Sequence, residues 1–149
     1  MKYFFNFCAL VFMSASIHAV NAEDCVVNIE AGDSLSYNMQ SITIAKNCAT
    51  AKINFKHTGN LGANIMGHNW VLAESADLSG IQGDGNVAGM QGGYLKKGDS
   101  RVLAATDVIG GGESTSVTFD TSVLQSGQDY SFFCTVMSHS VVMKGAFVV

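Results

Sequence analysis

Proline is absent from this chain of 149 residues, and charged residues make up only 13% of it. No turn can therefore owe its rigidity to a proline ring, and refolding cannot include a slow X–Pro isomerisation step. The basic residues never cluster, and the formal net charge is −4. Nucleic acid and anionic membranes are therefore poor candidates as partners. With 16 glycines and 48% hydrophobic residues, the composition is typical of a folded β-protein.

The first 22 residues have the pattern of a secretory signal peptide. One basic residue, Lys2, precedes an apolar run from Tyr3 to about Met13, and small residues lead to Val20-Asn21-Ala22. This pattern predicts export, cleavage after Ala22 and one mature domain over residues 23–149. Loss of Lys2 takes the net charge from −4 to −5. No later segment approaches about 20 uninterrupted apolar residues, so no membrane-spanning helix is expected.

Short runs with strand character recur along the predicted mature chain, separated by glycine-rich or polar turns. They occupy Val26–Ile29, Ile42–Ile44, Ile53–Phe55, His68–Leu72, Arg101–Thr106, Ser116–Phe119, Tyr130–Cys134 and Gly145–Val149. Seven or eight strands at this spacing predict an all-β fold, a Greek-key sandwich or barrel. The stretch 73–93 breaks the pattern. We expect one short helix or flap there, weakened by the glycines that follow Leu78.

Three cysteines remain after the predicted processing: Cys25, Cys48 and Cys134. An oxidising compartment permits one disulfide and leaves one thiol. Cys25 and Cys48 lie at the edges of the first strands and have no chemically suggestive neighbours, so they are the expected pair. Cys134 is then either a buried, inert cysteine or a metal-binding thiolate.

The residues that follow Cys134 favour the metal-binding alternative. In the segment CTVMSHSVVM, His139 and Met143 give the spacing C-x4-H-x3-M, and the upstream segment MGHNW offers His68. A loop that returns to the next strand turns such side chains toward one point, and soft sulfur with imidazole favours copper in both oxidation states. Each residue alone is more often part of a core, so the prediction rests on the combination. Zinc is the chemical rival, but a methionine ligand argues against zinc.

Several longer motifs carry a resemblance to a known family. The segments SITIAKNC, KHTGNLGANIMGHNWVL, DSRVLAAT, SVTFD and YSFFCTVMSHSVVMKG resemble those of azurins, the periplasmic blue copper proteins of bacteria with a cupredoxin fold. The resemblance spans nearly the whole predicted mature chain. It implies one type 1 copper bound in a plane by His68, Cys134 and His139. It also implies Met143 as a weak axial ligand and the carbonyl of Gly67 as a weaker one on the other side.

The resemblance further implies roles for residues around the copper. Asn69 links the two ligand-bearing loops and donates toward the thiolate, while His57 is a buried, non-ligating histidine whose titration couples to the copper potential. The edge of His139 reaches the surface in an apolar docking patch. The expected patch residues are Leu35, Leu61, Ile65, Met66, Val136 and Met137. Core packing is the alternative for Leu61 and Ile65.

Two turns depart from the azurin pattern. Azurins usually read CTFPGH where this chain reads CTVMSH, and their H-P-G turn is His57-Thr58-Gly59 here. The ligand number and spacing stay intact, but the loop that holds Cys134 and His139 loses the stiffness of a proline.

Three functions fit a copper site of this kind to different degrees. The favoured function is a monomeric, periplasmic electron carrier that docks transiently with redox proteins such as c-type cytochromes or a terminal reductase. The alternative is a copper storage or delivery protein that uses the same ligands. A copper enzyme needs an open coordination position, which four side-chain ligands do not leave, so no catalytic activity is expected.

Overall fold

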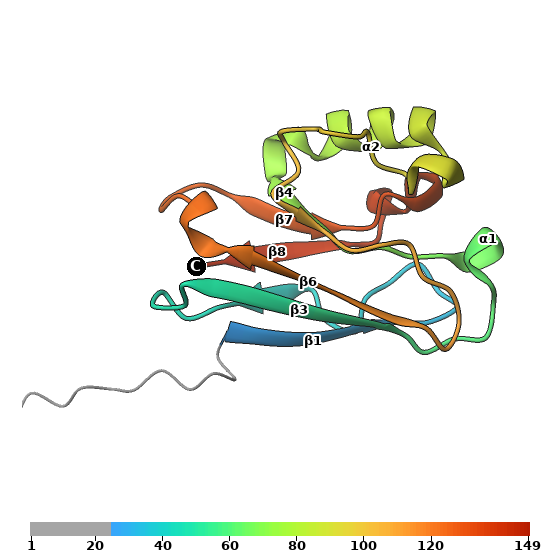
Figure 1. The fold of residues 1–149 in the computed structure, drawn as a ribbon, viewed down its shortest axis with the longest axis horizontal. Coiled ribbons are helices and arrows are strands. Elements are labelled where there is room, and N and C mark those ends of the chain that lie inside the picture. The colour runs from blue at the N-terminus through green and yellow to red at the C-terminus, as the bar shows by residue number, and fades with distance from the viewer. Residues whose placement is uncertain (1–24) are drawn as a thin grey trace, which may run out of the picture.

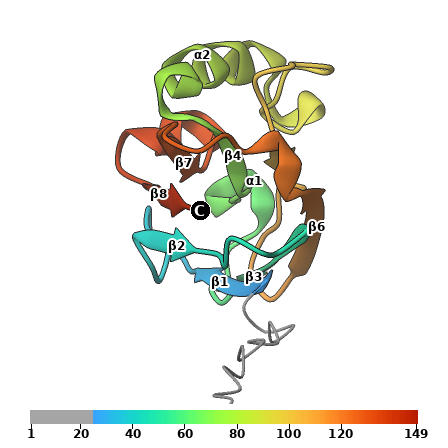
Figure 2. The ribbon, with the colours of Figure 1, turned by 90° about the vertical axis from the view of Figure 1, so that its left-hand side faces the viewer.

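The structure is a computed structural model that describes residues 25–149, so the predicted signal peptide and its cleavage site lie outside the described residues. Over these residues, eight strands form two sheets that pack face to face as an open β-sandwich (Figures 1 and 2). The smaller sheet has the order β1-β3-β6, with β1 at Val26–Ala31, β3 at Thr50–His57 and β6 at Ser114–Asp120. The larger sheet has the order β2-β8-β7-β4-β5, with β2 at Ser41–Thr43, β8 at Lys144–Val148, β7 at Tyr130–Phe133, β4 at Val71–Glu74 and β5 at Ala104–Ala105. The prediction of an all-β sandwich is confirmed, and the sheets do not close into a barrel.

The core lies between the two sheets and follows from the alternation of side chains along the strands. In β3, Ala51, Ile53 and Phe55 are buried, whereas Lys52 and Lys56 point to solvent. This period of two is what a strand with one covered face requires. An aromatic group at the centre of the core consists of Trp70, Phe119, Phe132 and Phe147. The side chain of Trp70, the only tryptophan of the sequence, is fully buried.

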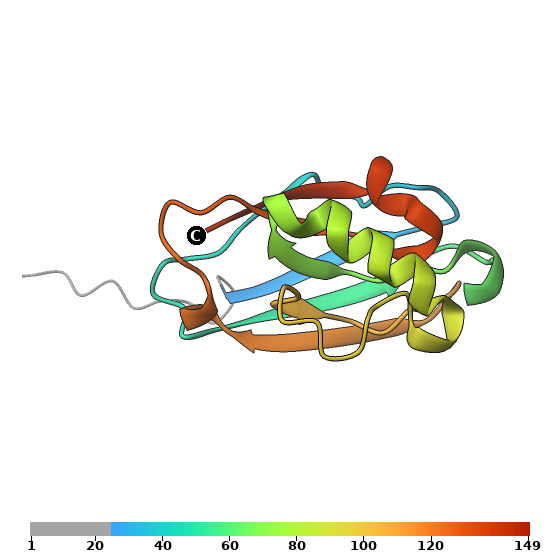
Figure 3. The ribbon, with the colours of Figure 1, turned by 90° about the horizontal axis from the view of Figure 1, so that it is seen from above.

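A helix, α2 (Leu78–Ala88), covers the outer face of the larger sheet (Figures 1 and 3). Ile81 of α2 packs in a second apolar cluster with Val71 and Phe133 of the sheet. This second cluster explains why β4 is buried on both faces and shows no alternation. The remaining helical turns are α1 at Ala63–Met66, η2 at Ser75–Asp77, η3 at Met90–Gly92, η4 at Thr121–Val123 and η5 at Val136–Val141.

The helix is longer than the glycines suggested, since Gly80, Gly83 and Gly85 all lie inside α2. Tertiary contact overrides helix propensity here. A side chain at Gly85 would bring its Cβ within 2.3 Å of the Tyr94 carbonyl oxygen, so the missing side chain lets the following loop pack against the helix. The helix ends at Gly89, whose φ of 60° favours glycine.

Two predicted strands are shorter than expected. Of the segment Arg101–Thr106, only Ala104 and Ala105 form the strand, and Arg101 before them forms ion pairs with Asp84 and Asp99. In the segment His68–Leu72, the ladder begins at Val71. His68 makes only an isolated bridge with Ile109, which frees its side chain from the regular sheet.

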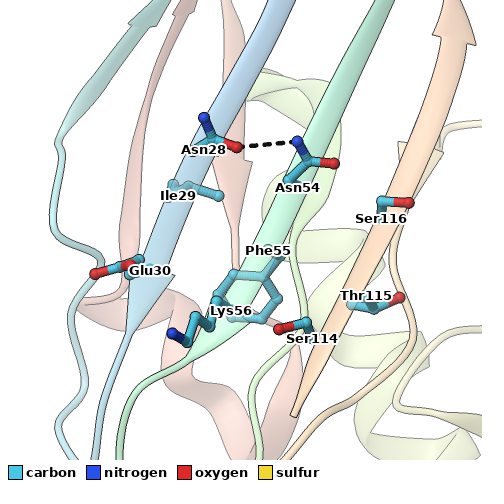
Figure 4. Close-up of a pocket in the computed structure, with 9 residues that line it drawn as sticks. All are labelled: Asn28, Ile29, Glu30, Asn54, Phe55, Lys56, Ser114, Thr115 and Ser116. Atoms are coloured by element: carbon cyan, nitrogen blue, oxygen red, sulfur yellow. Dashed lines mark hydrogen bonds between the residues drawn. The ribbon is translucent and has the colours of Figure 1, made fainter. Parts of the chain in front are cut away.

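A shallow hollow of about 530 Å³ lies on the polar outer face of the smaller sheet (Figure 4). The amide of Asn54 donates to the Asn28 side chain at 2.9 Å across the β1–β3 pair. The lining contains neither cysteine nor histidine. It is therefore no rival to the predicted site for a soft metal ion. Among residues 25–149, no helix is long and apolar enough to cross a bilayer.

The disulfide joins Cys25 to Cys48, as predicted. It spans a sequence separation of 23 residues. Replacing both cysteines by alanine is expected to lower the free energy of unfolding by about 3 kcal/mol, because the cross-link restricts the unfolded chain. Denaturant titration of the double variant and the parent checks this. The pairing leaves Cys134 as the free thiol of residues 25–149. If Cys134 is the metal-binding cysteine, as the sequence predicts, the folded double variant should still bind the metal, and loss of binding would contradict that prediction.

Candidate metal centre

The hairpin of β7 and β8 explains the spacing of the three C-terminal candidate ligands. Phe133 pairs with Lys144 in the antiparallel ladder, so Cys134 and Met143 are the next pair across it. The Cys134 N–H donates to the Met143 carbonyl at 3.1 Å. We define the copper loop as residues 135–142, the connection between these two residues. The Met143 N–H in turn donates to the His139 carbonyl at 2.8 Å, so the loop folds back over the end of the hairpin.

His68 reaches the same point from the other side of the chain. Its backbone exchanges two hydrogen bonds with Ile109, at 3.0 and 2.9 Å. Its Nε2 donates to the Gly32 carbonyl at 3.0 Å, which leaves Nδ1 free to face Cys134. Gly67, buried directly before it, admits no side chain, because a Cβ there would lie 2.3 Å from the Ala63 carbonyl oxygen. The backbone thus fixes both the position and the tautomer of His68.

Three candidate ligand atoms form a compact triangle. The Cys134 Sγ lies 3.7 Å from His68 Nδ1 and 3.6 Å from His139 Nδ1, and the two nitrogens are 3.2 Å apart. The point equidistant from all three atoms therefore lies about 2 Å from each, close to the lengths of metal–imidazole and metal–thiolate bonds. Among the described residues, these three form the group of His, Cys, Asp or Glu side chains that fits one metal ion.

The surroundings of this triangle control its protonation. Burial lowers the pKa of His68 to about 4, and burial also lowers the pKa of His139. Burial raises the pKa of the Cys134 thiol to about 12, although the backbone N–H groups of Asn69 and Val136 oppose this by favouring the thiolate. The metal-free site at neutral pH therefore holds two neutral imidazoles and one thiol, and metal binding must release the thiol proton.

Comparison with known proteins agrees with this site. The family model described as copper binding proteins of the plastocyanin/azurin family matches residues 23–149. The chain belongs to the plastocyanin/azurin family. It is 51% identical over 125 residues to the azurin of Pseudomonas chlororaphis, an alignment that covers 84% of this chain and 98% of that protein. It is 46% identical over 136 residues to the azurin of Bordetella pertussis, covering 91% of each.

The fold agrees with the same family. A solved structure of the azurin Az-iso2 from Methylomonas sp. strain J superposes with a TM-score of 0.81 at 40% identity, covering 83% of this chain and 96% of that one. The cupredoxin fold of azurins is therefore confirmed. The family and the His/Cys/His group, with Met143 buried beside it in the same hairpin, identify a type 1 copper site in this azurin-family chain.

The side chain of Asn69 connects the two halves of the azurin site. Its Oδ1 accepts from the Thr135 N–H at 2.9 Å, and its Nδ2 donates to the Thr135 hydroxyl at 2.8 Å. The Tyr37 hydroxyl donates to the Asn69 carbonyl at 2.6 Å. The loop of His68 and the residue that follows Cys134 are therefore tied together through buried hydrogen bonds.

His57 lies directly beside the copper ligands of the azurin site, fully buried and stacked on His68 with ring centroids 5.1 Å apart. Its Nε2 donates to the Met66 carbonyl at 2.8 Å, and its Nδ1 accepts from the Gly59 N–H at 3.1 Å. Both ring nitrogens are thus hydrogen bonded to backbone groups.

The predicted docking residues divide into exposed and buried members. Exposed side chains are those of Leu35, Leu61, Ile65 and Met137, and Met66 is half-buried. Leu61 and Ile65 are exposed, as expected of patch residues, so the alternative of core packing does not hold for them. Val136 was predicted to belong to this surface and does not, because its side chain is fully buried in the main core.

Sequence reasoning missed three contributors to the azurin site. The Asp33 carboxylate accepts from the N–H groups of Asn60 and Leu61 at 2.8 and 3.1 Å. Gln82 and Asn86 of α2 hydrogen bond to the copper loop. For Asp33 the sequence offers a weak signal, a short polar residue directly after a glycine. No sequence signal marks Gln82 or Asn86.

The lowered pKa of His68 makes the metal-free protein sensitive to acid. Between about pH 6.5 and pH 4 the unfolded chain binds a proton at this residue that the folded chain does not, so the free energy of unfolding falls as the pH falls. Urea titrations at several pH values check this. The variant His68→Gln should show a smaller slope against pH, and an identical slope in both proteins would contradict the assignment.

Proposed function

We propose that this azurin-family chain is a periplasmic electron carrier that passes single electrons between redox proteins. The observation that carries the proposal is the graded burial of the ligand residues. His68 and Cys134 are fully buried and Met143 is 1% exposed, whereas His139 is 8% exposed. An electron that enters or leaves through the ligands has its shortest exposed route at His139.

In this proposal copper would be held by the side chains of His68, Cys134, His139 and Met143, with the Gly67 carbonyl as a further, weak contact. Copper supplies the one-electron chemistry by alternating between Cu(II) and Cu(I). The chain supplies rigidity, because the ligands are held by a strand pair, an isolated bridge and the Gly32 carbonyl. A fixed set of ligands keeps rearrangement between the two oxidation states small.

Residues around the ligands tune the site in this proposal. The N–H groups of Asn69 and Val136 that favour the Cys134 thiolate act on the sulfur, which is one means of setting a copper potential. His57 takes no part as a ligand, since both its ring nitrogens are bonded to backbone groups. With its ligands supplied by the chain, the site offers no position to a substrate, and the protein is proposed not to be an enzyme.

The partner surface is proposed to be the apolar patch next to His139. It consists of Leu35, Leu61, Ile65, Met66 and Met137. Ile65 is 59% exposed and Met137 is 50% exposed. A group of exposed apolar side chains is informative as a possible contact surface, whereas a single one is not. A small apolar surface favours brief encounters between this protein, as a monomer, and redox proteins such as a c-type cytochrome or a terminal reductase.

Export to the periplasm is supported by the disulfide between Cys25 and Cys48, because such bonds persist in oxidising compartments. The predicted signal peptide over residues 1–22 is consistent with the same location. N-terminal sequencing of the protein recovered from a periplasmic extract should begin at residue 23.

Stopped-flow kinetics test the proposal. The variant Ile65→Lys should slow oxidation by a c-type cytochrome about tenfold. A charge buried in the apolar contact weakens the free energy of docking by about 1–2 kcal/mol. Oxidation by ferricyanide, a small oxidant that needs no apolar surface, should change little. The matched control is Val123→Lys, whose valine is 42% exposed in η4, beside the disulfide. Equal effects of the two variants would refute docking at the patch.

The rate of copper release to a chelator distinguishes the proposed electron carrier from the alternative, a copper storage or delivery protein. An electron carrier should exchange electrons between its own copies far faster than it releases copper. Rapid and reversible release of copper to a partner, with slow electron self-exchange, would instead establish a storage or delivery protein.

A further inference from the structure

The copper loop contains an unusual backbone conformation. Met137 has φ 44° and ψ 38°, and Ser138 has φ 66° and ψ 23°, so two successive residues other than glycine are left-handed. Side chains at Cβ make this conformation unfavourable for L-residues. It persists only where the surroundings hold it. Because the loop has no proline, some other contact must maintain its shape.

The helix α2 supplies such contacts from one of its faces. Asn86 Nδ2 donates to the Ser138 hydroxyl at 2.9 Å. One turn earlier, Gln82 Nε2 donates to the Thr135 carbonyl at 2.7 Å and to Asn86 Oδ1 at 3.0 Å. Residues four apart share a helix face, so the two amides act on the loop together. In Figures 1 and 3, the C-terminal part of α2 lies close to the part of the chain that contains η5, and the two elements are in contact.

The contacts meet the loop before its left-handed segment, at Thr135, and within that segment, at Ser138. The Thr135 backbone is held at its N–H by Asn69 and at its carbonyl by Gln82. Ser138, directly before His139, is held by Asn86. The two anchored residues therefore adjoin the two candidate ligands of this loop, Cys134 on one side and His139 on the other.

We propose that Gln82 and Asn86 are positioning residues for the copper site. Their amides hold the copper loop in its left-handed conformation. They thereby restrict the loop, which has no proline to stiffen it. This inference rests on the proposed ligand roles of Cys134 and His139. It goes beyond them by assigning the geometry and kinetic stability of the site to a helix that contributes no ligand.

Asn86 is suited to a test because its side chain is exposed. When the loop opens, water satisfies the separated amide and hydroxyl, so the bond is not needed to avoid a buried unpaired group. Alanine also has a higher helix propensity than asparagine. The variant Asn86→Ala should therefore unfold no more easily than the parent, while its copper loop opens more often.

The experiment measures loop opening in two ways. In the metal-free protein, labelling of Cys134 by Ellman's reagent is followed at its own peptide by mass spectrometry. In the copper-loaded protein, loss of Cu(II) to a chelator is followed by absorbance. Both rates should rise about threefold to tenfold in Asn86→Ala, the change expected from one neutral hydrogen bond. The control is Val87→Ala on the same helix, whose valine is 90% exposed, and it should leave both rates unchanged.

A second variant separates positioning from a general loosening. Glycine adopts the left-handed conformation without strain, so Ser138→Gly in the Asn86→Ala background should return both rates toward those of the parent. Rates in Asn86→Ala equal to those in Val87→Ala would overturn the inference. Faster copper loss without faster thiol labelling would overturn it too, because loop opening would then not be the cause. Thiol labelling needs neither copper nor a redox partner, so its result is independent of the electron-transfer proposal.

Discussion

Replacing Cys134 by serine should remove the intense blue absorption of the Cu(II) protein completely. The band depends on a copper–thiolate bond, and Cys134 is the free cysteine of residues 25–149. The narrow copper hyperfine splitting in the electron paramagnetic resonance spectrum should be replaced by the wider splitting of a site with nitrogen and oxygen ligands. Titration with one equivalent of Cu(II), before and after a mild reductant, gives both spectra.

Folding must be shown to survive the Cys134 substitution. The sulfur is fully buried, so a serine hydroxyl there loses hydrogen bonds to water and costs about 1–3 kcal/mol. Cys134→Ala avoids this burial and should lose the blue band equally. Circular dichroism of both metal-free variants checks that the sandwich is intact. A blue band that persists in either variant would mean that another sulfur binds the copper and would overturn the ligand assignment.

Replacing Asn69 by alanine should give the largest loss of stability among the polar residues discussed. The change removes both side-chain hydrogen bonds to Thr135 and leaves a buried N–H and a buried hydroxyl unpaired. We expect the free energy of unfolding of the metal-free protein to fall by about 3 kcal/mol, from a penalty of roughly 1–3 kcal/mol for each unpaired group. Urea titration of the metal-free protein measures this without interference from copper binding.

The control for Asn69 is another asparagine, Asn54, whose side-chain hydrogen bond is exposed to solvent. Asn54→Ala removes the exposed bond to Asn28 on the outer face of the smaller sheet (Figure 4). Such a change should alter stability by no more than about 0.5 kcal/mol. Similar losses in the two variants would show that Asn69 acts only as a generic hydrogen-bonding residue. A changed copper spectrum in Asn69→Ala alone would show that it also shapes the metal site.

The copper site could be predicted from the sequence because its spacing reflects simple geometry. The eight residues between Cys134 and Met143 are the connection of one hairpin, and an antiparallel pair brings its two ends together by construction. The strands were predictable for a related reason. Alternating burial in β3 and β6 leaves a mark on the sequence with a period of two residues.

Other features left no such mark. Val136 and Met137 are adjacent apolar residues in one loop, yet one is buried and the other is half exposed. The backbone turns left-handed at Met137, so the side chains of these two neighbours point in different directions. The contacts of Gln82 and Asn86 depend on where α2 lies over the sheet, and that position is fixed by the packing of Ile81 against Val71 and Phe133. The glycines within this helix lower its intrinsic helix propensity, so the sequence predicted only a short helix or flap there.

The chain order also governs when copper can first be held. β4 and His68 precede β7 and β8 in the chain, and these two later strands separate β2 from β4 in the larger sheet. An incomplete chain that lacks these two strands has neither the Cys134 thiolate nor the hairpin that carries His139 and Met143. Metal capture therefore waits for the polypeptide that can also complete its fold, and a truncated product cannot sequester copper in this geometry.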